Sequence, residues 1–106
     1  MKATKRTRLE RAGWAVGNAA DFLGLSAAES TLVDMRIALG ASLRERRTNA
    51  SLTQAALARR IGSSQSRIAK MEAGDATVSI DLLIRALLAL GATKSDVARA
   101  LARRVA

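Results

Sequence analysis

The stretch LTQAALARRIGSSQSRIAKMEAG, residues 52–74, decides the fold of this chain. Thr53 suits the N-cap of a helix over QAALARRI, and Gly62 suits the left-handed residue that ends it. Ser64 suits the N-cap of a second helix over QSRIAKMEA, which stops at Gly74. Two short helices with a turn of only a few residues between them must cross steeply. The stretch therefore predicts a tightly packed pair of helices.

The positions where two such helices touch carry small or apolar residues. Ala58 is small at the point where the second helix packs over the first, and Gly62 permits the positive φ of the turn. Ile68 and Met71 recur at helical spacing and face back into the core. This combination of residue types and spacing is specific for a steeply crossed pair.

Residues 39–92, which contain this pair, resemble the helix-turn-helix domain of the xenobiotic-response-element (XRE) and phage lambda-repressor-like family. The resemblance rests on the segments LTQAALA, GSS, MEAG and LLIRALLALG. Two positions depart from the family's pattern: Ala56 stands where many relatives have Glu, and Ser63 replaces the usual apolar turn residue. The resemblance implies a compact, all-α, repressor-like domain of five helices that binds double-stranded DNA. An added N-terminal helical segment and a C-terminal helix flank it.

The predicted second helix supplies the surface that would read DNA. In a helix-turn-helix, this helix lies in the major groove with its N-terminal residues at the base edges. At about 100° per residue, the small and polar side chains share one face. We therefore expect base contacts from Gln65, Ser66, Ala69 and Lys70, where Lys70 could reach either a guanine or a phosphate. Gln65 is the first candidate, because a Gln amide pairs bidentately with adenine.

Contacts to DNA phosphates are expected around that face. Gln54 lies at the start of the first helix, where backbone N–H groups and the helix dipole favour a phosphate, and it resembles the family's phosphate-contacting Gln. Arg67 lies at the edge of the base-reading face. The further candidates are Ser64, Arg47 and Arg44. For the last two, a solvated surface charge is an equally good interpretation. For Glu72, at the end of the second helix, we expect a structural hydrogen bond or ion pair and not a contact with a base.

The charge of the chain supports a polyanionic partner. Its 106 residues include 18 Lys and Arg against 9 Asp and Glu, for a formal net charge of +9. Between Arg46 and Met71 there are six basic residues and no acidic one. Such a one-signed segment favours nucleic acid through counterion release. The alternative, that the basic residues only maintain solubility, predicts scattered charges rather than this concentration.

The amino-acid composition excludes several classes of function. The chain lacks Cys and His, which excludes the usual metal sites, thiol chemistry and imidazole catalysis, and its carboxylates show no paired arrangement. We therefore expect no enzyme, metal site or cofactor.

The absence of Pro and the scarcity of aromatic residues favour helix throughout. No apolar run approaches the roughly 20 residues of a membrane span, and the basic start lacks a secretory apolar segment, which predicts a cytoplasmic protein without a membrane partner.

The chain divides into four predicted segments. They are a basic arm at 1–12, a helical extension at 13–38 that runs into the first helix of the domain, the helix-turn-helix domain at 39–92, and a C-terminal helix at 93–106. The arm holds five basic residues against one acidic residue. It suits a contact along DNA phosphates or in a minor groove, and a frayed terminus without a role is an equal alternative.

Helix boundaries outside the pair follow from caps and glycines. Asn18 and Gly24 predict a short helix over 19–23, and Ser26 opens a longer one that runs to about Arg47. The apolar residues expected to be buried in these helices are Trp14, Phe22, Leu25, Leu32, Met35, Leu39 and Leu43. Ser79 caps an apolar helix to Leu90, and Thr93 with Asp96 forms a capping box for the last helix.

These features predict a transcriptional regulator that reads DNA with the helix Gln65–Ala73. Proteins of this kind usually read two half-sites about one helical turn apart, which favours a homodimer and a repressor. The apolar helix at 80–90 needs several packing partners, and the last helix, with Val97, Leu101 and Val105, is a candidate interface element. Two alternatives stay open: an antitoxin that binds a toxin through a flank, and a bridging factor for the transcription machinery.

Overall fold

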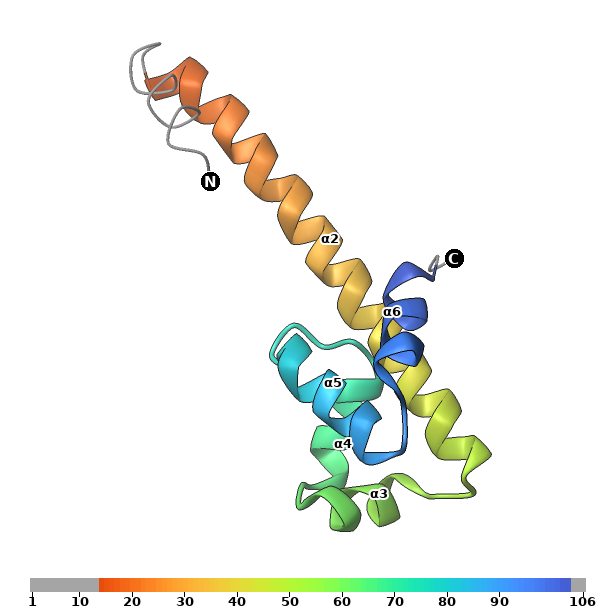
Figure 1. Ribbon diagram of the computed structural model, residues 1–106. Helices are drawn as coiled ribbons and strands as arrows, with labels where there is room; N and C mark the ends of the chain where they lie inside the picture. Colours follow the sequence, from red (N-terminus) through yellow and green to blue (C-terminus); the bar gives the residue numbers. More distant parts are fainter. Residues whose placement is uncertain (1–13, 104–106) are drawn as a thin grey trace. The chain divides into compact units, whose positions relative to one another are not determined.

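The computed structural model describes the backbone of residues 14–103 and the side chains of residues 26–103. The chain divides into two compact units, 1–32 and 33–106. The described residues form five α-helices and no strand (Figure 1), which confirms the all-α class. The basic arm and Val105 lie outside the described residues, as do the side chains of Trp14, Phe22 and Leu25.

Helix α2, Trp14–Asn49, is continuous, and this corrects two boundaries predicted from the sequence. Gly24 does not end a helix and Ser26 does not begin one. An interior glycine costs only about 1 kcal/mol relative to alanine, and extending an existing helix is easier than nucleating a new one. Although α2 has 36 residues, neither it nor any other described helix is long and apolar enough to cross a membrane.

Helices α3, Gln54–Ile61, and α4, Gln65–Glu72, form the predicted pair. The hydroxyls of Thr53 and Ser64 each accept a backbone N–H from the first turn of the following helix, at 3.0 and 3.1 Å. Gly62 has the left-handed φ of 70° that the turn requires. Both N-caps and the C-terminal glycine are therefore confirmed.

Helices α5, Ile80–Ala89, and α6, Lys94–Ala102, complete the fold. The predicted capping box is present: the Thr93 hydroxyl accepts the Asp96 N–H, and the Asp96 carboxylate accepts the Thr93 N–H at 2.8 Å. The backbone hydrogen bond from Thr93 lowers the pKa of Asp96 below its usual value. Arg46 of α2 lies 3.4 Å from the same carboxylate and joins α6 to α2.

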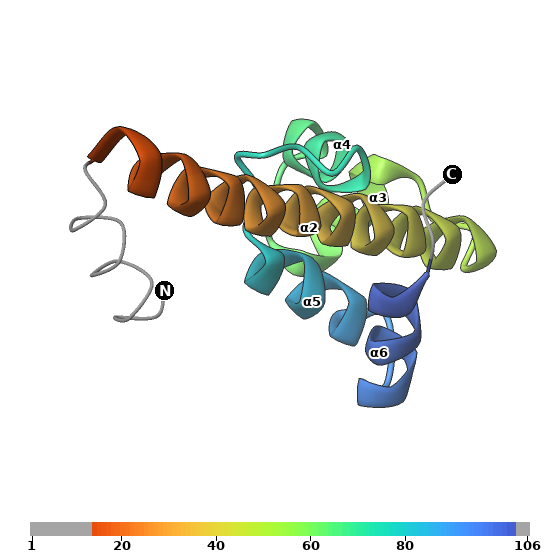
Figure 2. The same cartoon turned by 90° about the horizontal axis from the view of Figure 1, so that it is seen from above.

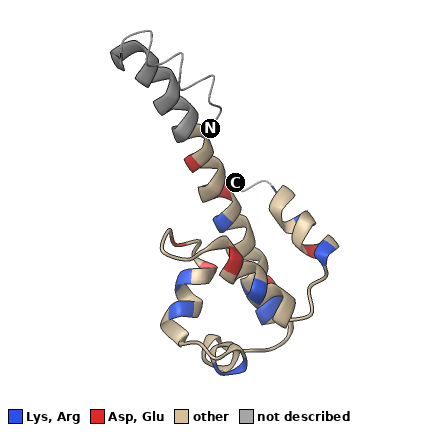
Figure 3. Ribbon diagram, turned by 60° about the vertical axis from the view of Figure 1, so that its left-hand side comes forward, with Lys and Arg blue, Asp and Glu red and all other residues tan. Residues whose placement is uncertain are grey.

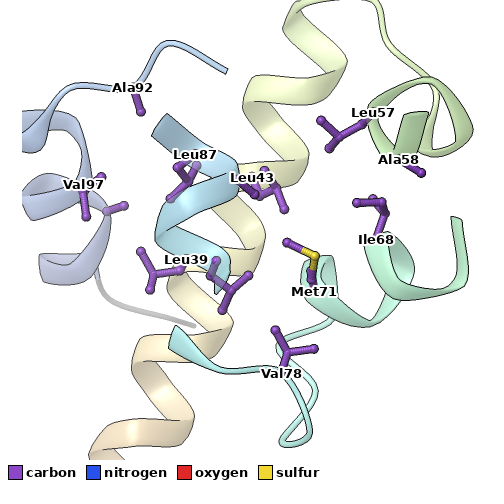
Figure 4. Packing of buried hydrophobic residues seen from close by; sticks show 13 residues of the cluster. Leu39, Leu43, Leu57, Ala58, Ile68, Met71, Val78, Leu87, Ala92 and Val97 are labelled. Carbon is purple, nitrogen blue, oxygen red and sulfur yellow. The ribbon is translucent and has the colours of Figure 1, made fainter. Parts of the chain in front are cut away.

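One hydrophobic cluster holds the second unit together (Figure 4). Figure 2 shows α4 on one side of α2, and α5 and α6 on the other. The largest fully buried side chains of the cluster are Leu39, Leu43, Leu57, Ile68, Met71, Leu83 and Leu87. The apolar stripe predicted along α2 is buried only in part, because Leu32 is exposed. Val97 packs into the cluster, so this residue of α6 is used within the chain rather than offered as an interface.

Candidate nucleic-acid interface

Helix α4 separates a core face from a solvent face. Ile68 and Met71 are fully buried, as their spacing predicted. The residues expected to contact DNA from this helix are all exposed; they are Gln65, Ser66, Arg67, Ala69 and Lys70. The helix therefore presents a continuous polar surface whose position is set by the core residues behind it. The contacts of this surface with DNA stay a prediction.

A buried carboxylate joins the three helices that surround this surface. Glu72, at the end of α4, accepts hydrogen bonds from Arg47 Nε at 2.5 Å and Arg47 Nη2 at 3.0 Å. The Gln54 amide donates to the same carboxylate at 3.1 Å. The Glu72 side chain is 5% exposed and that of Arg47 is 10% exposed. The structural role predicted for Glu72 is confirmed.

The position of Arg47 corrects its prediction as a phosphate contact. Besides the two bonds to Glu72, its guanidinium donates to the carbonyl of Leu52 at 2.7 Å. The hydrogen bonds to Glu72 raise the pKa of Arg47 above its usual value, so the guanidinium stays charged. A guanidinium that is buried and donates a hydrogen bond from each of its three nitrogens is not accessible to a phosphate. We assign Arg47 a role in fixing α4 instead.

Gln54 and Arg44 differ from Arg47 in their accessibility. Gln54 is the first residue of α3 and is half-buried. Its amide nitrogen carries two hydrogens, and the bond to Glu72 uses one of them, so the second is left to donate to an acceptor outside the domain. Arg44 is exposed on α2. Their contacts with DNA phosphates stay predictions.

Two glycines let the backbone of α2 approach the end of α4. A Cβ on Gly40 would lie 2.9 Å from the Glu72 carbonyl oxygen and would also meet the Met71 carbonyl oxygen. Gly74 has φ of 70°, and a Cβ on it would lie 2.9 Å from the Cα of Ile37. Sequence reasoning missed Gly40. Its signal was a glycine inside an otherwise helical pattern, which marks a site of close packing.

The exposed charges of this region are mainly basic. Figure 3 shows Lys and Arg on α3, α4 and the C-terminal end of α2. Arg59 and Arg60 of α3 are exposed, as are Arg67 and Lys70 of α4. Glu72, at the end of this helix pair, is paired with the buried guanidinium of Arg47. The surface therefore attracts a polyanion.

The turn between α3 and α4 carries an unsatisfied hydroxyl. Ser63 Oγ is buried without a hydrogen-bond partner among the described residues. A buried polar group that lacks a partner costs about 1–3 kcal/mol. An apolar side chain at this position would avoid that cost.

Ser63→Ala is therefore expected to stabilise the protein by about 1 kcal/mol, because it removes the buried hydroxyl without adding volume. Thermal unfolding followed by circular dichroism would show a Tm higher by about 5 °C. Ser79→Ala is the matched control: it removes a hydroxyl that does accept a bond, from the Leu82 N–H, and should lower stability by about 1 kcal/mol. A lower Tm for Ser63→Ala would show that the hydroxyl is satisfied.

Comparison with known families agrees with this geometry. A family model described as a helix-turn-helix domain matches residues 38–102, from the C-terminal part of α2 to the end of α6. The matched stretch is longer than the 39–92 that the sequence motifs delimit, because it includes α6. Searches of curated proteins and of solved structures found no match to the chain.

Proposed function

Because this chain belongs to the helix-turn-helix domain family, we propose that it is a sequence-specific DNA-binding regulator of transcription. One observation carries the proposal: the exposed polar face of α4 is backed by fully buried Ile68 and Met71 and held at its end by Glu72. A recognition element must present its side chains in one fixed orientation. The core and the Glu72 hydrogen bonds provide that orientation.

The roles of individual residues follow from their places on the helix pair. Gln65, at the exposed start of α4, is the first candidate to pair with an adenine edge. Ser66, the residue after Gln65, is proposed to contact the base next to that adenine. The Ala69 methyl group is proposed to pack against a thymine methyl. The phosphate contacts that support this position are proposed to come from Gln54, Ser64, Arg67 and Arg44.

The regulator is proposed to act in the cytoplasm as a homodimeric repressor. Each chain carries a single recognition helix, and two of them are needed to read two half-sites roughly 34 Å apart. Leu88 on α5 is 49% exposed, and it is the most exposed of the large apolar side chains in helices α3–α6. Sedimentation of the free protein and of its DNA complex measures the number of chains in each.

An antitoxin is the second candidate, and one observation favours it. Leu32 and Val33 of α2 are 38% and 43% exposed. Neighbouring exposed apolar side chains are a feature of surfaces that bind another protein. Expression together with the product of a neighbouring gene, followed by purification, tests this alternative. A stable complex supports the antitoxin, and it does not conflict with DNA binding by α4.

The decisive experiment is the selection of bound duplexes from a random pool with the wild-type protein and with Gln65→Ala. We expect a palindromic site with half-sites about 10–11 base pairs apart. Gln65→Ala should relax the preference at one position in each half-site, at a cost of about 1–3 kcal/mol, because it removes a base contact.

Arg67→Gln is the matched control for this selection. It removes a proposed phosphate contact and should weaken binding to all sequences alike, without changing the selected site. If the wild-type protein selects no sequence, binds with a steep salt dependence and is indifferent to Gln65→Ala, its basic charge acts only generically. The proposed function then fails.

A further inference from the structure

A polar hollow lies between the C-terminal part of α2 and helix α6. Its volume is about 550 Å³, within the range of about 300–1,000 Å³ that is usual for small-molecule sites. The residues that line it come from these two helices and from Arg103, which follows α6. Helices α3 and α4 contribute no residue to it. The hollow is therefore distinct from the helix pair that is proposed to bind DNA.

Charged side chains surround the hollow, and the positive ones are in excess. Arg46 comes from α2, and Arg99 and Arg103 come from the side of α6. The carboxylates in the lining are those of Glu45 and Asp96, and no third carboxylate lines it among the residues that the structure describes. Three guanidinium groups thus share the hollow with two carboxylates, so the lining carries a positive charge that it does not balance itself.

The ion pairs between described residues use few of the guanidinium N–H groups. Asp96 pairs with Arg99 and also lies 3.4 Å from Arg46 Nη2. Glu45 accepts one hydrogen bond from Arg103, at 3.3 Å. Each guanidinium carries five N–H donors. Arg46 and Arg103 therefore keep several donors that can bind a ligand.

Small side chains create the space between these charges. Ser42 on α2 is half-buried, and Ala100 on α6 is 3% exposed. Ala102, the last residue of α6, also lines the hollow and is exposed. Longer side chains at these positions would fill the space that the arginines surround. The hollow is therefore open to a molecule from solvent.

A small organic anion matches this lining. Planar guanidinium groups form paired hydrogen bonds with the oxygens of a phosphate or a carboxylate. Glu45 and Asp96 can accept hydrogen bonds from hydroxyl or amino groups of the same molecule. A metal cation does not match, because three cationic side chains repel it.

We infer that this hollow binds a small organic molecule with a dianionic group, such as a phosphate monoester or a dicarboxylate. Arg46, Arg99 and Arg103 hold the anionic oxygens, and the small residues leave room for the rest of the molecule. Helix α6 lies on the other side of α2 from α4 (Figure 2), so the protein can hold this ligand and DNA at the same time. The ligand site does not depend on the proposed DNA-binding function.

The first test is a titration of the isotope-labelled protein, followed by the NMR shifts of its backbone amides. Glycerol phosphate and succinate are added separately at constant ionic strength. At least one of them should bind saturably with a Kd of about 1 mM or lower, and the tighter of the two identifies a phosphate or a carboxylate as the preferred group. The shifts should be confined to α6 and the C-terminal part of α2. Failure of both compounds to bind would overturn the inference.

Arg99→Gln should weaken this binding about ten-fold, because it removes a charged hydrogen-bond donor from the hollow. Arg85→Gln is the matched control. Arg85 is also an exposed arginine in a helical ion pair, with Asp81 at 3.0 Å, but it lies outside the hollow. Its variant should bind within about two-fold of the wild type. Exposed ion pairs contribute about 1 kcal/mol or less, so both variants should stay folded.

The second test blocks the hollow without removing an arginine. Ala102→Glu places a carboxylate beside the guanidinium groups, where it competes with the ligand, and should weaken binding about ten-fold. Ala102→Gln has the same size without the charge and should bind within about three-fold of the wild type. Circular dichroism of both variants shows whether the helices are kept.

Three results would overturn the inference and leave the proposed DNA binding intact. If Arg99→Gln binds like Arg85→Gln, or Ala102→Glu binds like Ala102→Gln, the hollow does not hold the anion. If Arg67→Gln abolishes the binding instead, the anion lies on α4. If the shifts grow with added potassium chloride as they do with the two compounds and never saturate, the basic protein attracts anions only generically. Sequence selection from random duplexes tests the DNA-binding function separately.

Discussion

Glu72→Ala is expected to destabilise the protein by about 3–5 kcal/mol, because it leaves the buried guanidinium of Arg47 without its counter-charge. Small domains are stable by only about 5–15 kcal/mol, so much of the chain would be unfolded at moderate temperature. The loss has two further sources. The Gln54 amide loses its acceptor, and the end of α4 loses its connection to α2. Urea unfolding followed by circular dichroism measures the change.

The double variant Arg47→Met, Glu72→Met is the control for this prediction. Replacing both members of a buried ion pair by apolar residues of similar size is often neutral or stabilising. We expect it to recover most of the stability lost in Glu72→Ala. Its DNA affinity should stay below that of the wild type, because Gln54 is no longer held in position. Equal destabilisation of the double variant would show that the cost arises from packing and not from an unpaired charge.

Gly40→Ala is expected to cost about 3 kcal/mol, although alanine is the better helix former. The added methyl group would meet the carbonyl oxygens of Met71 and Glu72, which are backbone atoms and cannot rotate away. The end of α4 must therefore shift. Sequence-selective DNA binding should weaken together with stability.

The neighbouring residue offers the control. Ala41 is exposed on the next position of α2, so Ala41→Gly should cost only the intrinsic helix propensity of about 1 kcal/mol and leave DNA selectivity unchanged. A Gly40→Ala variant more stable than the wild type would show that α2 and α4 do not approach each other this closely.

Much of the local structure was predictable, because its causes lie within a few residues. A Thr or Ser hydroxyl caps an N–H three positions later, and Gly62 alone accounts for the left-handed turn. The same local reasoning failed at Gly24 and Ser26. Those residues carry the signals of a helix end and a helix start, but continuation of α2 overrides both.

The sequence also predicted which residues of the candidate interface are exposed and which are buried. Helical periodicity separates the exposed Gln65, Ser66 and Lys70 from the buried Ile68 and Met71 without any knowledge of the fold. The partners of residues distant in the sequence were not predictable. Arg47 has the same sequence signature as Arg44, a basic residue near the end of a helix, yet the first is buried and the second is exposed.

The sequence by itself determined the helical class, the caps, the turn and the solvent face of α4, because each depends on propensity or hydrogen bonds within one or two helical turns. Only the tertiary structure decided that Arg47 pairs with Glu72, that Gly40 meets the end of α4, and that Arg36 holds the Val78 carbonyl. These contacts join residues 25 to 42 positions apart, or a glycine to a carbonyl of another helix. They arise only when the shared core brings α2 against α4 and its loop.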